Sequence, residues 1–194
     1  MGMVVGLGNP GRRYVDTRHN VGFAVIETLA HRWSIPADGK QLGALVGSGR
    51  ISNNKAMLVR PQSFMNRSGT PVRSLMGYFK TASDKVVVVH DDLDLPFGRV
   101  QVKRGGGHGG HNGLRDLNKH VGPDYVRVRM GVGRPPQGWE TADYVLGKWT
   151  PSEKNELESI LGRGADAVES ILRDGVEAAM NVVNVRKSAD KTSC

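Results

Sequence analysis

Hydrophobic positions along the chain form short apolar runs and period-two alternations that are typical of strands. Six segments show such a pattern: residues 3–7, 44–51, 56–60, 86–89, 100–103 and 126–132. The run at 86–89 is Val-Val-Val-Val without interruption, which predicts a central strand covered on both faces. In 126–132, Arg127 and Arg129 alternate with apolar residues, which predicts a strand with one basic face.

Between these segments, apolar side chains recur at helical spacing. The predicted helices are 21–33, 70–79, 112–120 and a C-terminal helical region from 151 to 184 with a break at 162–164. Asn20 is positioned to cap the first helix, Pro71 suits the first turn of the second, and Thr150 and Glu153 form a capping-box pattern. Strands interleaved with helices predict an α/β fold, a three-layer α/β/α sandwich around a mixed, mostly parallel sheet.

Length and composition narrow the class of protein. The 194 residues, of which 38% are hydrophobic and 24% charged, suffice for one sizeable core and argue against wholesale disorder. We predict a single domain over 1–185 and a polar, mobile tail over 186–194. The apolar runs are too short to span a membrane, and the N-terminus lacks the pattern of a secretory signal. The only cysteine, Cys194, is the last residue, which excludes an internal disulfide and fits a cytoplasmic protein.

The charge is unevenly distributed. The chain carries a net charge of +8, and because 151–194 holds six basic and eight acidic residues, residues 1–150 carry +10. Eight of the basic residues lie between Arg99 and Arg134, against only Asp116 and Asp124. This concentration favours a polyanionic partner, with nucleic acid first, although a generic solubilising surface accounts for charge alone equally well.

The glycine-rich segment 6–11 (GLGNPG) follows the first predicted strand and matches the spacing of a dinucleotide-binding loop. That motif requires a helix that begins inside the loop, whereas the apolar helical pattern here begins only near Val21. Two alternatives remain beside it: a turn without a ligand, and a loop that places Asn9 and Tyr14 at a site. His19, at the end of the same loop, can act as a general base near neutral pH or can be a simple capping or surface residue.

Polar residues also follow other predicted strands. Segment 63–69 (SFMNRSG) comes before a helix, where Phe64 and Asn66 are either functional or only core and turn residues. Segment 90–94 (HDDLD) follows the central apolar strand, at the edge where open α/β sheets place their sites. Its carboxylates could bind a divalent metal, orient a histidine from elsewhere in the chain, or only form a capped turn.

The stretch 105–113 (GGGHGGHNG) is the least ordinary part of the sequence. Its glycines lose much conformational entropy on ordering, which favours a role beyond a passive turn, such as close approach of the backbone to a ligand. His108 and His111 lie three residues apart, but without a matching acid or cysteine motif they indicate a metal site only weakly. A flexible linker remains an alternative.

Together, these segments resemble the bacterial peptidyl-tRNA hydrolases. The shared motifs occur in family order over most of residues 3–150: 6–11 with Tyr14, 17–20 (TRHN), 64–66 (FMN) with 68–69, 90–94 and 105–114. The resemblance implies an enzyme that cleaves the ester between a peptide and tRNA, acts as a monomer, and uses neither a metal nor another cofactor. It assigns His19 as the base that activates water, Asp91 as the residue that orients it, and Asn9 to discrimination between blocked and free aminoacyl ends.

The resemblance further implies that substrate and tRNA contacts come from a second group of residues: Tyr14, Phe64, Asn66, His111 and Asn112. From charge alone, Lys103, Arg115 and Arg129 are candidates to bind acceptor-stem phosphates without reading sequence. Direct attack by water also accounts for the absence of a serine nucleophile motif. Two rival classes stay open: a non-catalytic RNA-binding protein with this fold, and a nicotinamide-dependent oxidoreductase built on residues 6–11.

Overall fold

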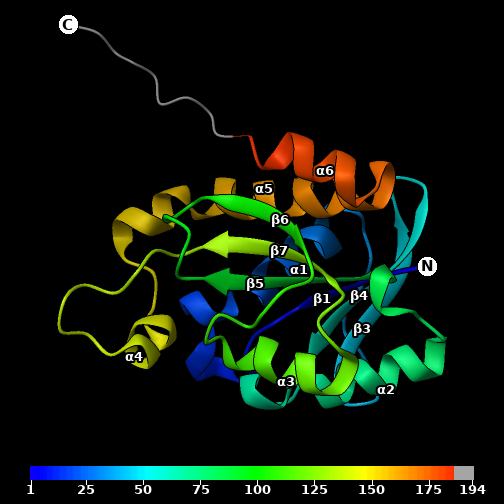
Figure 1. The fold of residues 1–194 in the computed structure, drawn as a ribbon, viewed down its shortest axis with the longest axis horizontal. Coiled ribbons are helices and arrows are strands. Elements are labelled where there is room, and N and C mark those ends of the chain that lie inside the picture. The colour runs from blue at the N-terminus through cyan, green and yellow to red at the C-terminus, as the bar shows by residue number, and fades with distance from the viewer. Residues whose placement is uncertain (186–194) are drawn as a thin grey trace, which may run out of the picture.

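The computed structural model describes residues 1–185, which form one seven-stranded sheet with helices on both faces (Figure 1). The strands are β1 (Gly2–Gly6), β2 (Gly39–Gln41), β3 (Ala44–Ile51), β4 (Asn54–Pro61), β5 (Val86–Asp92), β6 (Val100–Arg104) and β7 (Val126–Gly131). Their order in the sheet is β2-β3-β4-β1-β5-β7-β6. The central strands β4, β1, β5 and β7 are parallel, and β2, β3 and β6 pair antiparallel at the edges. The predicted mixed, mostly parallel sheet is confirmed.

Helices cover the two faces of this sheet. On one face lie α1 (Val21–Arg32), α5 (Pro151–Asp174) and α6 (Val176–Val183), and on the other lie α2 (Gly69–Phe79) and α3 (Asn112–Val121). Figure 1 shows α5 and α6 on the opposite side of the strands from α2 and α3, which gives the predicted three layers. Within residues 1–185, no helix combines the length and the apolar character needed to cross a membrane. The predicted tail, 186–194, lies outside the described residues.

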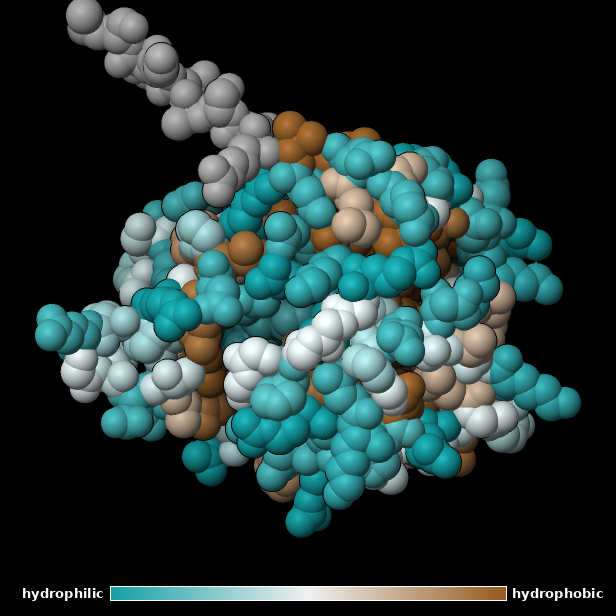
Figure 2. Space-filling model, in the orientation of Figure 1, coloured by the Kyte–Doolittle hydropathy of each residue, from teal (hydrophilic) through white to brown (hydrophobic). Residues whose placement is uncertain are grey.

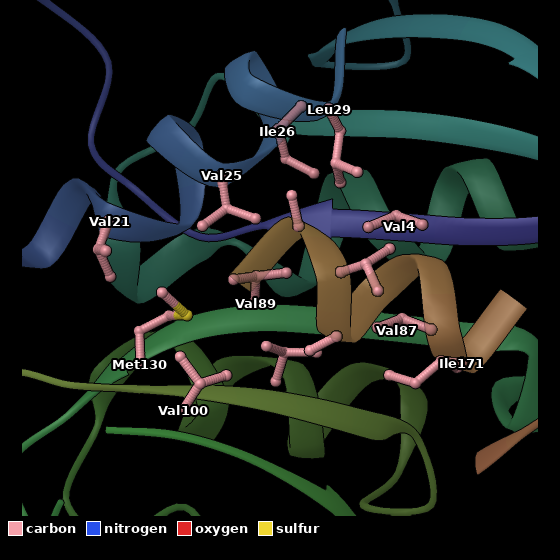
Figure 3. Packing of buried hydrophobic residues seen from close by; sticks show 14 of the residues in the cluster. Val4, Val21, Val25, Ile26, Leu29, Val87, Val89, Val100, Met130 and Ile171 are labelled. Atoms are coloured by element: carbon pink, nitrogen blue, oxygen red, sulfur yellow. The ribbon is translucent and has the colours of Figure 1, made fainter. Parts of the chain in front are cut away.

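The hydrophobic core is divided by the sheet into two clusters. Val4, Val87 and Val89 belong to the cluster under α1 and α5, and Figure 3 shows Val89 on the side of Val25 and Val87 beside Ile171. The alternate residues of β1 and β5 face α2 and α3: Met3, Val5, Val86 and Val88. Both faces of the apolar run are therefore buried, as a central parallel strand requires.

The C-terminal helices differ from the prediction. The break expected at 162–164 is wrong, because α5 continues without interruption from Pro151 to Asp174. A Cβ atom at Gly164 would lie 2.8 Å from Cε of Met130, so this glycine allows the helix to pack closely on the sheet. The helix ends instead at Gly175, whose φ of 88° is favourable only for glycine. Strand β2 and the short helix α4 (Thr141–Leu146) were not predicted.

The carboxyl ends of the parallel strands lie together at one end of the sheet, and the loop after β1 crosses this end. Gly6 and Gly22 let α1 approach closely, since a Cβ at Gly22 would lie 2.4 Å from the carbonyl oxygen of Val89. Between β1 and α1 the chain forms only the short 3₁₀ turns η1 (Arg12–Tyr14) and η2 (Arg18–Asn20). No helix begins inside the glycine segment, so the geometry of a dinucleotide-binding loop is not present.

Candidate active site

Two histidines and one carboxylate meet at the end of β5. Nδ1 of His19, from η2, lies 2.9 and 3.0 Å from the two carboxylate oxygens of Asp91. Nε2 of His111, the residue before α3, lies 2.9 Å from Oδ1 of the same carboxylate. The three residues come from separate parts of the sequence, and the sheet edge brings them together. Asp91 is 3% exposed, so its charge is compensated by these two rings and not by water.

The hydrogen bonds define which ring nitrogens carry hydrogen. Nδ1 of His111 accepts the backbone N–H groups of Gly113 and Leu114, at 3.1 and 3.3 Å, and so caps α3. Its Nε2 must then carry the hydrogen that it donates to Asp91. His19 donates from Nδ1, which leaves its Nε2 as the basic nitrogen, and within residues 1–185 this atom has no hydrogen-bond partner. A histidine held in this way can accept a proton from water.

The electrostatics favour a basic His19. Burial of the ring disfavours its charged form, but the charge of Asp91 and the hydrogen bond to it outweigh burial and raise the pKa of His19 above 6.5. Burial likewise disfavours the Asp91 carboxylate, yet His19 and His111 together hold its pKa well below 3.8. At neutral pH the site therefore presents an ionised carboxylate and a histidine whose conjugate acid is stabilised.

His90 lies behind this cluster. Its Nδ1 donates to the backbone carbonyl of Asp91 over 2.7 Å, and its ring lies edge-on to His111 with 5.2 Å between centroids. Burial and the neighbouring His111 lower the pKa of His90 to about 3, so this ring is neutral at physiological pH. The neutral ring therefore adds no charge to the cavity that it helps to line.

The cluster opens into a cavity of about 510 Å³. His19, Asp91, His111 and Asn112 line it together with Lys103 and Arg129 from the antiparallel strand pair, and α4 closes it through Thr141, Ala142 and Val145. Hydrophilic side chains gather on the surface over β6 and β7 (Figure 2). The cavity thus has a basic wall beside a histidine–carboxylate centre. Arg115 lies exposed on α3 and does not line it.

The basic wall is partly neutralised within the protein. Nε of Arg129 lies 2.7 Å from Oδ2 of Asp92, and its guanidinium also bonds to Gln101. Arg127 is only 3% exposed and donates to the carbonyl oxygens of Gly106 and Gly107. The predicted basic face of β7 is therefore used inside the protein, with Arg127 holding the glycine loop and Arg129 pairing with a carboxylate. Lys103 forms no ion pair among the described residues.

Asn9 is held by contacts that fix the direction of its amide. Its Oδ1 accepts the backbone N–H of Met65 over 2.7 Å, which leaves the NH₂ group of Asn9 free to donate. The backbone of Asn9 is bonded on both sides by the amide of Asn20, through N to Oδ1 and Nδ2 to O, each at 2.9 Å. Asn20 occupies the N-cap position of α1, as predicted, but its side chain makes no capping hydrogen bond and holds the Asn9 loop instead.

The segment after β4 places the remaining predicted residues. Asn66 lies exposed in the 3₁₀ turn η3 (Met65–Arg67), and Phe64 is 55% exposed with its ring edge-on to Tyr14 at 6.4 Å. A Cβ at Gly113 would lie 2.6 Å from Sδ of Met65, so the start of α3 packs directly on this turn. Through Met65 this segment contacts Asn9, but Asn9, Tyr14, Phe64 and Asn66 are all outside the set of residues that lines the cavity.

The acidic segment does not form one metal site. Asp92 pairs with Arg129, and Asp94 pairs with Arg134, so the carboxylates after β5 point to different partners. The residues whose ligand atoms converge are His19, Asp91 and His111, with all three atoms within 4.8 Å of one another. Two imidazoles and a carboxylate are a possible set for a transition metal, and the same atoms can also pair directly as N–H donors and carboxylate acceptor.

Comparison with known proteins agrees with the motifs. The family model described as peptidyl-tRNA hydrolase matches residues 3–191. The chain is 46% identical over 190 residues to a peptidyl-tRNA hydrolase of Anaeromyxobacter, covering 97% of this chain and 99% of that protein. It is 48% identical over 181 residues to one from Nocardia farcinica, covering 92% and 94% of the two chains.

The chain belongs to the peptidyl-tRNA hydrolase family.

A crystal structure of the peptidyl-tRNA hydrolase from Acinetobacter baumannii has the same fold, with a TM-score of 0.89, 36% identity and 95% of each chain covered. A crystal structure of a peptidyl-tRNA hydrolase in complex with N-propanol has a TM-score of 0.90 and 37% sequence identity, with 97% of each chain covered. The resemblance drawn from the sequence is thereby confirmed, and the chain is an enzyme of this family. The roles assigned to individual residues stay predictions.

Several residues that build this site were missed by the sequence analysis. Asn20 was assigned only to a helix cap, and Arg127 only to a basic face. The wall formed by α4 was not foreseen, because the six residues of this helix are too few to show a helical period. They also follow a segment, 134–140, that is rich in proline, glycine and polar residues. For Asn20 a signal existed, since it belongs to the TRHN motif, but nothing in the sequence indicates that its partner is the Asn9 backbone.

Proposed function

We propose that this protein hydrolyses the ester bond between a peptide, or an N-blocked amino acid, and tRNA, with His19 as the general base. The observation that carries the proposal is the pair of contacts between His19 Nδ1 and Asp91, which leaves Nε2 basic. Nε2 takes a proton from water while the water oxygen adds to the ester carbonyl carbon. The tetrahedral intermediate then collapses, and the ribose oxygen leaves with the proton held by His19. The peptide departs as a carboxylic acid, which loses its remaining proton to solvent and becomes a carboxylate.

Side-chain amides can serve the substrate around this centre. The ester carbonyl oxygen develops negative charge and needs a hydrogen-bond donor. The NH₂ group of Asn9 is free because its Oδ1 is held by Met65, and Asn112 stands at the start of α3 on the cavity wall. We assign Asn9 to the peptide end of the substrate, with Tyr14, Phe64 and Asn66 around it, and His111 to the support of Asp91.

The tRNA is the proposed macromolecular partner, and its phosphates are the groups that a basic wall can bind. Lys103 lines the cavity without an ion pair among residues 1–185, and Arg115 is exposed on the neighbouring helix. Contacts with phosphate position a nucleic acid without reading its sequence, which suits an enzyme that accepts many tRNAs. We further propose that the protein acts as a monomer in the cytoplasm.

The direct test is incubation of the protein with an N-blocked aminoacyl-tRNA. Hydrolysis is measured as the release of the blocked amino acid. We expect release with and without a chelator, because the mechanism uses side chains alone. Inactivity toward this substrate would favour the non-catalytic RNA-binding alternative. Loss of activity with chelator, restored by adding a divalent metal, would instead favour a metal held by His19, Asp91 and His111.

Substitution of Asn9 by alanine or aspartate is expected to change the preference for blocked over free aminoacyl-tRNA. An amide can pair with a peptide group but offers nothing that compensates a desolvated ammonium group, so the selectivity depends on this side chain. Aspartate supplies that compensation and should shift the ratio toward the free substrate. Cleavage of both substrates is measured side by side, and an unchanged ratio would place the selectivity on another residue.

Neutralising Lys103, Arg115 or Arg129 with glutamine is expected to weaken tRNA binding about equally for unrelated tRNAs. For every phosphate that the variant no longer binds, the slope of log affinity against log salt should become shallower by about 0.7–0.9. The rate at saturating substrate should hardly change, because these cations bind ground state and transition state alike. Affinity is titrated at several salt concentrations.

Two comparisons sharpen this test. Lys55→Gln is a matched control. Lys55 is exposed near the amino end of β4, whereas the cavity lies at the carboxyl ends of the parallel strands. Arg129 already pairs with Asp92, so Arg129→Gln should also lower thermal stability, whereas Lys103→Gln should not. Equal salt slopes for all variants and the control would show that the charge of residues 1–150 is a general surface property.

A further inference from the structure

Arg18 directly precedes His19, yet its side chain is turned away from the cavity and buried, with 6% of the residue exposed. Its guanidinium forms a bidentate pair with Glu153, with Nη2 to Oε2 at 2.7 Å and Nε to Oε1 at 3.3 Å. Nη1 donates to the carbonyl oxygens of Lys148, at 3.0 Å, and Tyr144, at 3.4 Å. An arginine fork can make this set of contacts, and the point charge of a lysine cannot.

The same segment is joined to residues 147–149 through the backbone. The N–H of Arg18 donates to the carbonyl of Gly147 over 3.1 Å, and that of Trp149 donates to Asp16 over 3.2 Å. An isolated antiparallel bridge pairs Thr17 with Lys148. The turn that carries His19 is therefore attached directly to the chain that leaves α4.

Both ends of this connection are held by further contacts. Glu153 is fixed by the capping box of α5, where its Oε2 also accepts the N–H of Thr150 at 2.7 Å. The Arg18 guanidinium lies over the rings of Tyr144 and Trp149, with 4.4 and 5.5 Å from Cζ to the centroids. At the far side, α4 contributes Thr141, Ala142 and Val145 to the cavity wall. One buried side chain thus connects the proposed base, the wall of the cavity and the start of α5.

We propose that Arg18 is a positioning residue, which holds His19 on Asp91 and fixes the α4 wall relative to it. This inference rests on the proposed role of His19. The pair with Glu153 lies outside the cavity, so Arg18 does not contact substrate and acts through the η2 turn. Without its contacts, η2 and the α4 wall are expected to shift independently, and the catalytic histidine loses its alignment with both carboxylate and substrate.

The test is Arg18→Lys, which keeps the charge and loses the fork. A displacement of about 1 Å at a catalytic group can cost on the order of 100-fold in rate, so we expect kcat to fall by about 10- to 100-fold, with a smaller change in KM. The titratable groups that face the His19 ring are Asp91 from β5 and His111 before α3. Weakening of the Asp91 contact should lower the pKa of His19 toward 6.5, as measured by NMR titration of its ring proton.

A second variant and a control separate positioning from stability. Glu153→Gln removes the ion pair but keeps a side chain that can complete the capping box, so it should shift the His19 titration in the same direction even where Arg18→Lys does not fold. Arg32→Lys is the matched control. Arg32, the last residue of α1, also pairs with carboxylates of α5, Asp166 and Glu169, but it does not line the cavity. It should leave kcat and the His19 titration unchanged.

Two results would overturn the inference. One is an unchanged His19 titration in both Arg18→Lys and Glu153→Gln. The other is a kcat of these two variants no lower than that of the control Arg32→Lys. The NMR measurement does not depend on turnover. A shifted titration in these variants together with full activity of His19→Ala would therefore refute the proposed base and leave the positioning of the ring by Arg18 established.

Discussion

Replacing His19 by alanine is expected to lower kcat by about 10²- to 10⁴-fold, the usual contribution of a general base, while KM changes little. The reason is that Nε2 is the basic nitrogen beside the cavity, and its partner nitrogen is fixed on Asp91. The ring makes no other hydrogen bond within residues 1–185, so its removal should leave substrate binding nearly intact. Single-turnover cleavage of a blocked aminoacyl-tRNA separates the chemical step from binding.

The pH dependence checks the same assignment. A general base must be neutral, so kcat/KM should fall as the pH drops through the pKa of His19, which lies above 6.5. The acidic limb should vanish with His19→Ala. His31→Ala, which removes an exposed histidine of α1, is the matched control and should keep both rate and limb. Wild-type turnover by His19→Ala would show that another group activates the water.

The sheet was predictable from the sequence because its central strands are buried on both faces. In β1 and β5 the residues that face the helices on either side are apolar. A short, uninterrupted apolar run of this kind is typical of a central strand in a parallel sheet. The false break in α5 has the opposite origin. Gly164 lowers helix propensity locally, but the contact with Met130 needs a residue without a side chain, and tertiary packing outweighs propensity.

The site was predictable only in part. His19 and Asp91 were named from motifs, and the structure brings them within hydrogen-bond distance although 72 positions separate them. Sequence patterns give which residues lie at the ends of the parallel strands, but not how side chains pair there. The pairing of Arg129 with Asp92 and the amide lock between Asn20 and Asn9 depend on side-chain direction, which periodicity does not contain.

Substituting Asp91 by asparagine is expected to reduce kcat nearly as far as loss of His19 itself. The carboxylate accepts N–H groups from both His19 and His111, whereas an amide can accept from only one side and must donate on the other. His111 cannot change tautomer, because its Nδ1 accepts the N–H groups that begin α3. His19 must therefore accept at Nδ1 and carry its hydrogen on Nε2, where it no longer acts as a base.

Two measurements follow for Asp91→Asn. Combined with His19→Ala, it should add almost nothing to the loss of kcat, since both changes remove the same function. In the native protein the pKa of Asp91 lies well below its ordinary value of 3.8. The ionised carboxylate therefore stabilises the fold fully above the pKa of the unfolded chain, and this stabilisation is lost as the pH falls through the native pKa. The difference in unfolding free energy between wild type and variant should therefore shrink on acidification.

Asp84→Asn provides the matched control for both measurements, because Asp84 lies two residues before the same strand, is exposed, pairs with Lys85 and does not line the cavity. It should keep wild-type kcat and a nearly unchanged stability. Multiplicative losses in the double variant of His19 and Asp91 would contradict the shared function. They would give Asp91 a task of its own, such as holding a metal with His111, and sensitivity of the His19→Ala residual rate to a chelator would then identify it.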